Sequence, residues 1–107
     1  MSEFGNFLKK EISRNKLSQN KFAKKVGISS YYVGQIIKGE KRPPSRELQI
    51  KIATILNFDE NKKVKFFNLI AKEKNDIPSD IYNGIMNYEE KWDEVRKVLS
   101  RGDNNYD

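Results

Sequence analysis

Apolar residues recur every three or four positions along most of the chain, a spacing typical of amphipathic helices. In the first stripe these residues are Phe4, Phe7, Leu8 and Ile12. They predict a helix over about 3–15, and similar stripes predict helices over about 19–26, 30–38, 46–56 and 60–74. No strand-like alternation persists anywhere in the sequence. The pattern therefore predicts an all-α fold in which five helices with short connections form one domain.

Small polar residues and glycines mark the ends of these helices. The predicted N-caps, whose side-chain oxygens accept free backbone N–H groups, are Ser18, Ser29, Ser45 and Asp59. Gly27 and Gly39 follow the second and third helices, where a left-handed residue often ends a helix. Two prolines at 43 and 44 exclude helix from the next loop. On the helix over 60–74, the residues expected to face the core are Val64, Phe67, Ile70 and Ala71.

Asn75, Asp76 and Pro78 interrupt the helical pattern, so the domain is expected to span 1–75. A second apolar stripe with heptad-like spacing follows within 76–101. Its members are Ile81, Ile85, Tyr88, Trp92, Val95 and Leu99. Asn83 and Gly84 weaken its first part, which favours two helices, the second over about 87–100. Residues 102–107 are expected to be a flexible tail.

Two interpretations of this C-terminal stripe remain open. In the first, it is a homodimer surface made by Ile85, Tyr88, Trp92, Val95 and Leu99. In the second, the same residues pack on the helices over 46–56 and 60–74 of their own chain.

The charge of the chain is unevenly distributed. The sequence has 21 Lys and Arg against 15 Asp and Glu, a net charge of +6. Residues 1–58 contain 12 of the basic and 4 of the acidic residues, a balance of +8, whereas residues 59–107 balance at −2. A positive N-terminal half favours a polyanion as its partner.

The chain contains no cysteine and no histidine. This composition excludes disulfide bonds, Cys–His zinc sites, and catalysis by a thiolate or an imidazole. The carboxylate pairs Glu89–Glu90 and Asp93–Glu94 lie in a charged helix and are interpreted as solvated surface. We therefore expect no enzyme activity, no catalytic residue, no metal and no cofactor. Without a signal peptide or an apolar spanning stretch, the protein is expected to be cytoplasmic, bacterial or phage-encoded, with no membrane partner.

The most informative segment is residues 19–38, QNKFAKKVGISSYYVGQIIK. Ala23 is small where two helices would cross, Gly27 allows the turn, and Val33 and Ile36 would point inward. The flanking residues are Leu17-Ser18-Gln19 before the segment, and Gly39 with Lys41-Arg42-Pro43 after it. With these residues, the run from about 7 to 56 resembles the phage-repressor-like family of small helical DNA-binding domains, the Xre or Cro/C1 helix-turn-helix type.

The resemblance implies that the helix over 30–38 enters the major groove of double-stranded DNA. The residues at base-reading positions are Ser30, Tyr31, Gly34 and Gln35. The residues expected at phosphates are Gln19, Ser29, Tyr32, Lys38, Lys41, Arg42, Ser45 and Arg46. Gln35 suits adenine, because its amide can both donate to N7 and accept from N6. Gly34 has two open explanations, close approach to the groove floor or a position without contact.

One departure from the family pattern concerns a buried ion pair between the first helix and the recognition helix. Its two positions fall on Ile12 and Ile37, which are both apolar. Because both partners are exchanged together, the fold is expected to be retained.

The sequence supports two functions of different class. The first is a sequence-specific DNA-binding transcriptional regulator, most often a repressor, bound as a homodimer to an inverted-repeat operator. The second is a protein-binding module, an antitoxin or an inhibitor of an immune effector, that retains the helix-turn-helix for autoregulation. A neighbouring toxin gene or a co-purifying protein partner would distinguish the second function from the first.

Overall fold

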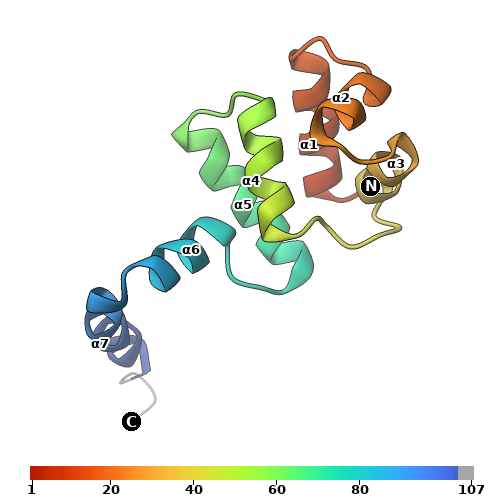
Figure 1. Cartoon of the computed structure of the whole chain (residues 1–107). Coiled ribbons are helices and arrows are strands. Elements are labelled where there is room, and N and C mark those ends of the chain that lie inside the picture. The colour runs from red at the N-terminus through yellow and green to blue at the C-terminus, as the bar shows by residue number, and fades with distance from the viewer. Residues whose placement is uncertain (104–107) are drawn as a thin grey trace.

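Seven α-helices and one short 3-10 helix make up residues 1–103, which are the residues that the computed structural model describes (Figure 1). In chain order they are α1 (Glu3–Arg14), α2 (Gln19–Val26), α3 (Ser30–Lys38), α4 (Arg46–Ile55), α5 (Glu60–Lys74), α6 (Ser79–Asn87), η1 (Glu89–Lys91) and α7 (Trp92–Asp103). This part of the chain contains no strand, so the predicted all-α class is confirmed. Helix α7 continues to Asp103, and the rest of the predicted tail, 104–107, lies outside the described residues.

The capping residues that the sequence marks begin the predicted helices. The side chains of Ser18, Ser29, Ser45 and Asp59 accept the backbone N–H groups of Lys21, Tyr32, Leu48 and Lys62 at 3.1, 3.0, 3.3 and 2.8 Å. Each bond satisfies a donor that the first turn of a helix leaves free. Gly27 and Gly39 have φ angles of 88° and 80°, and this left-handed conformation ends α2 and α3 as predicted.

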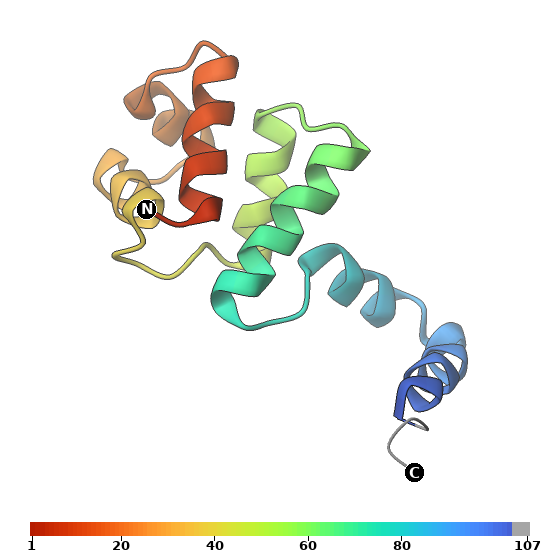
Figure 2. The ribbon, with the colours of Figure 1, turned by 180° about the vertical axis from the view of Figure 1, so that it is seen from behind.

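Helices α1–α5 enclose one apolar core, with α1 beside α5 and the α2–α3 pair packed on α1 and α4 (Figures 1 and 2). An aromatic cluster lies within this core. The Phe66 ring has the rings of Phe4, Phe7, Phe58 and Phe67 around it, at centroid distances from 5.2 to 6.1 Å. The cluster joins α1 to α5 and to the loop that precedes α5.

The predicted inner face of α5 is wrong at one position. Val64 is 47% exposed, whereas Phe66 and Ile70 are fully buried. Because successive helical residues are rotated by about 100°, a buried arc centred on Phe66 and Ile70 leaves Val64 at its outer edge. Phe67 and Ala71 are buried as predicted.

Two contacts of α1 leave no recognisable signal in the sequence. A Cβ atom on Gly5 would overlap the carbonyl oxygen of Ile37, so α1 and the end of α3 approach each other through a position that only glycine can occupy. The buried Glu11 carboxylate accepts a hydrogen bond from the Lys62 ammonium at 2.7 Å. This ion pair links α1 to α5, whereas Ile12 and Ile37 are both buried in the apolar core.

Residues 76–103, which we call the arm, leave the domain after α5 (Figures 1 and 2). Helix α6 packs against α5, and α7 lies beyond α6 and away from both α4 and α5. The molecule is consequently 51 Å long but only 26 and 21 Å across. The predicted division into two helices is confirmed, with the break at Tyr88 and η1 before the second helix. Packing of the whole stripe on α4 and α5 is not observed.

Candidate nucleic-acid interface

Helices α2 and α3, joined through Gly27, form the helix-turn-helix. Ala23 on α2 and the α3 residues Val33 and Ile36 are buried, as their spacing predicts. The opposite side of α3 faces solvent, where Lys38 is exposed at its C-terminal end. The fold therefore holds α3 by its apolar side and leaves its polar side available to a ligand.

The two adjacent tyrosines of α3 have different environments. Tyr31 is 75% exposed and is the most accessible of the predicted base-reading residues. Tyr32 is half-buried and packs against the core, while its backbone N–H donates to Ser29. Gln35 is half-buried on the same helix. Tyr31 can therefore reach a ligand without rearrangement, whereas Tyr32 also has a structural role.

Gly34 has an environment that neither sequence-based explanation anticipates. The Gln19 side-chain nitrogen donates to the Ser30 carbonyl oxygen at 3.1 Å, and so crosses from α2 to α3. A Cβ atom on Gly34 would lie 3.1 Å from the same nitrogen, closer than ordinary van der Waals contact. Gly34 thus gives Gln19 room beside α3. The second N–H of the Gln19 amide stays available for a phosphate oxygen.

The loop after α3 carries a group of exposed cations. Lys38, Lys41 and Arg42 are exposed, and none of them forms an ion pair within residues 1–103. The two prolines that follow are buried, which fixes the path of the loop between α3 and α4. Ser45 then caps α4 at the exposed end of the loop. Cations and a helix N-terminus therefore lie together beside the recognition helix.

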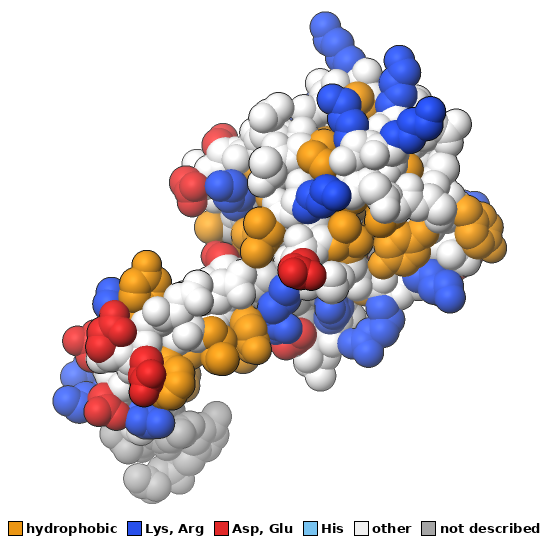
Figure 3. Space-filling view, in the orientation of Figure 1, with side chains coloured by type: hydrophobic (Ala, Val, Ile, Leu, Met, Phe, Trp, Pro, Cys, Tyr) orange, Lys and Arg blue, Asp and Glu red, His pale blue; other side chains and the backbone are white. Residues whose placement is uncertain are grey.

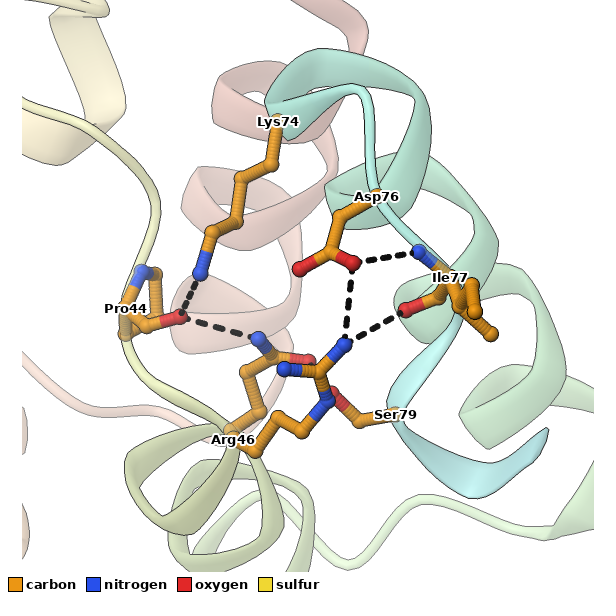
Figure 4. Close-up of polar contacts among 7 residues, drawn as sticks. Pro44, Arg46, Lys74, Asp76, Ile77 and Ser79 are labelled. Carbon is orange, nitrogen blue, oxygen red and sulfur yellow. Dashed lines mark hydrogen bonds and ion pairs between the residues drawn. The ribbon is translucent and has the colours of Figure 1, made fainter. Parts of the chain in front are cut away.

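Arg46 is the predicted phosphate-contacting residue that the structure places elsewhere. Its guanidinium donates to the Asp76 carboxylate at 3.0 Å and to the Ile77 carbonyl at 3.4 Å (Figure 4). It also lies over the Tyr82 ring, 3.9 Å from the centroid. The position at the start of α4 suggested a phosphate contact, but the side chain turns towards α6 and is engaged within the chain.

Asp76 is held as a carboxylate by the same arrangement. The backbone N–H of Ile77 donates to Asp76 Oδ1 at 2.7 Å and holds the pKa of this carboxyl below its ordinary value. The Arg46 guanidinium lowers the pKa further, and desolvation opposes both effects. The sequence marked Asp76 only as a helix-breaking residue.

Gln49 is a second contact between α4 and α6 that the sequence does not reveal. Its side chain is buried, donates to the Pro44 carbonyl oxygen at 2.9 Å, and accepts the Ser79 hydroxyl at 2.7 Å. A single amide therefore touches both the loop after the recognition helix and the first residue of α6. We call the contacts of Arg46 and Gln49 with the arm the α4–α6 junction.

The predicted dimerisation residues are partly brought together on the arm. A shallow groove is lined by Ile85, Tyr88, Trp92 and Val95, together with Ile81, Gly84 and Lys91. The Trp92 indole donates to the Ile85 carbonyl oxygen, so α6 covers part of this side chain. Leu99 lies farther along α7 and remains 64% exposed. The groove is apolar and open to solvent.

The two parts of the molecule carry net charges of opposite sign. Residues 1–75 contain 17 basic and 7 acidic residues, a net charge of +10, whereas residues 76–103 contain 4 and 7, a net charge of −3. On the face shown in Figure 3, basic side chains project from the helix-turn-helix part, and acidic and basic side chains mix on the arm. A polyanion is therefore attracted to the domain and not to the arm.

The fold and this surface define the class of a helix-turn-helix DNA-binding protein. A comparison with protein families matched residues 8–62 to the family described as Helix-turn-helix, which is 55 of the 107 residues. The chain belongs to this family, in its phage-repressor-like Xre or Cro/C1 form, whose members are DNA-binding regulators. Neither the comparison with curated proteins nor the comparison with solved structures returned a match. Among residues 1–103, no helix has both the length and the apolar character needed to span a membrane.

Proposed function

We propose that the protein is a transcriptional repressor that binds a specific inverted-repeat operator as a homodimer. The observation that carries this proposal is the outward side of α3, which is polar, accessible, and followed by three cations that make no ion pair in the described chain. A helix of this kind fits the major groove of B-DNA. Occupation of a promoter by such a domain excludes other proteins, which favours repression over activation.

We assign recognition of the DNA base sequence to Ser30, Tyr31, Gly34 and Gln35. Gln35 forms a bidentate pair with adenine, because its amide supplies one donor and one acceptor in the same plane. Tyr31 brings a hydroxyl and an aromatic edge, and its exposure supports contact with a base or a thymine methyl group. Gly34 keeps the α3 backbone close to the groove floor while it accommodates Gln19.

Affinity for the DNA backbone is assigned to residues on both sides of α3. They are Gln19, Ser29, Tyr32, Lys38, Lys41, Arg42 and Ser45. The exposed cations neutralise phosphates and release counterions. Ser29 and Ser45 stand at helix N-termini, where free N–H groups and the helix dipole favour an anion. Arg46 is left out of this set because its guanidinium is bound to Asp76.

Assembly is assigned to the arm. Trp92, Val95 and Leu99 lie on one side of α7, and Leu99 is 64% exposed in the single chain. The first turn of α7 is acidic, and its later part carries Arg96, Lys97 and Arg101. Two α7 helices that pair antiparallel about a two-fold axis would bring the acidic end of each against the basic end of the other. This self-complementarity favours a second copy of the chain as the occupant.

Selection of bound duplexes from a random DNA pool, followed by measurement of the mass of the complex, tests the proposal. We expect two inverted half-sites, with centres about 34 Å or a multiple of this distance apart, and two chains per duplex. Affinity should fall steeply with salt, with a log–log slope of about −0.9 for each phosphate contact. Failure to enrich a motif, or a salt dependence with a slope near zero, would contradict sequence-specific DNA binding. A single half-site bound by one chain would reject the homodimer alone.

The acidic arm with its open apolar groove also favours a second candidate function. A protein-binding module, such as an antitoxin or an inhibitor of an immune effector, would use this groove for its protein partner and the helix-turn-helix for autoregulation. Isolation of a stable complex with the product of a neighbouring toxin or effector gene, lost on Tyr88→Ala, would support this function. A neighbourhood without such a gene would count against it.

A further inference from the structure

We infer that Arg46 and Gln49 are positioning residues that set the half-site spacing of the operator, because they fix the arm against the loop that follows the recognition helix. This inference rests on the proposed homodimer. In such a dimer, the two α3 helices are connected through α4, α5, α6 and α7 of each chain. Any freedom between α4 and α6 would therefore change the distance and angle between the two recognition helices.

Gln49 connects the two parts through one planar group. Gln49 and Ser79 are both 2% exposed, and the bond between them is 2.7 Å long. The other end of the amide holds the carbonyl oxygen of Pro44, which also lies 3.4 Å from the Lys74 ammonium. Since hydrogen bonds weaken when they are bent, this arrangement fixes the direction in which α6 leaves the domain.

Arg46 fixes the other side of the same turn. Its planar guanidinium is bound by the Asp76 carboxylate and the Ile77 carbonyl, and its face lies on the Tyr82 ring, as Figure 4 shows in part. Its Nε atom is buried without a hydrogen-bond partner among the described residues, which is a cost that a free surface arginine would avoid. The fold accepts this cost at a position beside the DNA-facing loop.

Apolar packing cannot replace these polar contacts in orienting the arm. Ile77, Ile81 and Tyr82 at the beginning of the arm are all exposed, and no arm residue belongs to the buried apolar core. An apolar contact of small area permits sliding, whereas two directional contacts separated by one turn of α4 do not. The orientation of α6 therefore depends on the α4–α6 junction more than on burial.

The test is a series of duplexes in which the distance between two selected half-sites increases by single base pairs. Wild-type protein should prefer one distance over its neighbours. The preference is the ratio of the affinity at the best distance to the affinity at neighbouring distances. We expect Arg46→Gln and Gln49→Met to lower this ratio by about fivefold, the size expected when contacting groups are uncoupled. Arg42→Gln is the matched control for Arg46→Gln, because it removes the same charge from the neighbouring loop. It should weaken binding at every distance by the same factor.

A second pair of variants keeps the inference testable if a buried substitution prevents folding. Asp76→Asn removes the carboxylate partner of Arg46 from an exposed turn, and Asp80→Asn is its control on the exposed side of α6. Asp76→Asn should flatten the distance preference while affinity for a single half-site stays unchanged and the unfolding temperature falls only slightly, because the lost ion pair is partly exposed. Asp80→Asn should leave all three unchanged.

The possible failures are distinguishable. Variant profiles that overlay the wild-type profile after scaling would overturn the positioning role and leave the homodimer intact. A wild-type protein that binds the two half-sites independently, with no preferred distance, would overturn both the homodimer and the inference that rests on it.

Discussion

The helix-turn-helix domain and the arm are both helical, but they bury their apolar residues differently. In the domain, Phe22, Ile36 and Phe66 have no measurable exposure. In the arm, Met86 and Leu99 remain more than half exposed. The first five helices begin at residues whose side chains cap them, whereas α6 has no side-chain cap. The domain therefore buries its large apolar side chains within one chain, whereas the arm leaves several of its own exposed.

This difference supports the proposal that the arm, and not the domain, is the part that binds a partner. Burial of one large apolar side chain is worth roughly 1.5–3 kcal/mol, so the domain gains its stability from its own core. The arm is held by a few directional contacts and leaves its apolar groove open. Its charge of −3, opposite to that of the domain, also keeps it away from DNA phosphates.

Gly5→Ala should produce the largest effect, because the added Cβ would overlap the Ile37 carbonyl oxygen. Relief of this overlap requires α1 to move away from α3, and we expect a loss of about 3 kcal/mol in the free energy of unfolding. Urea titration measures it. The neighbouring exposed position provides the control, since Asn6→Ala should change stability by less than about 0.5 kcal/mol. A Gly5→Ala variant as stable as wild type would show that α1 does not approach the Ile37 carbonyl of α3 closely enough to exclude a methyl group.

Substitutions on α7 should change assembly and leave the domain intact. Trp92→Ala is expected to weaken the dimer by about 2 kcal/mol or more, since buried aromatic anchors dominate interfaces. Leu99→Ser is the sharper variant, because Leu99 is 64% exposed in the single chain and its loss should affect a second chain more than its own. Sedimentation at micromolar concentration measures both effects.

Val64→Ser is the matched control for Leu99→Ser. Val64 is also an exposed aliphatic residue, at 47%, but it lies on the domain. It should leave the sedimenting mass unchanged. A wild-type protein that stays monomeric even with DNA present would end the dimer proposal, and an effect of Val64→Ser equal to that of Leu99→Ser would move the interface to the domain.

Gln35→Ala should relax sequence preference at a cost of about 1–3 kcal/mol on the preferred operator. Lys41→Ala should instead weaken binding to all sequences alike, because it removes only a phosphate contact. Binding motifs selected with each variant distinguish the two outcomes. An unchanged motif with Gln35→Ala would mean that α3 does not read bases through this residue.

The features that the sequence predicts correctly depend on neighbouring residues. Ser18, Ser29 and Ser45 begin helices because each oxygen reaches an N–H only three residues away. Gly27 and Gly39 end them because the left-handed conformation is a property of a single residue. Helix periodicity likewise located the outward side of α3, whereas the division of the arm into two helices was indicated by Asn83 and Gly84 and not by the apolar spacing, which continues through Tyr88.

The features that the sequence does not reveal depend on residues far apart in the chain. Gly5 is required because Ile37 passes beside it, and Arg46 turns inward because Asp76 lies 30 positions later but 3.0 Å away. Gln49 has the appearance of an ordinary polar helix residue until the loop and α6 are placed around it. Val64 lies at the edge of a buried arc whose centre only the packed structure defines.

Gly84→Ala should produce the smallest effect and gives the most direct test of the division between domain and arm. No atom outside its own helix lies within 4 Å of a Cβ added at Gly84, so alanine should be accommodated and should favour α6 by up to about 1 kcal/mol. Hydrogen exchange of the amides of residues 79–87 should slow, because the arm opens less often. The urea midpoint of the domain should stay the same, because α6 contributes no residue to the apolar core. A urea midpoint that rises by the equivalent of the whole gain in α6 would show that the arm and the domain unfold as one cooperative unit. The arm would then contribute to the stability of the domain.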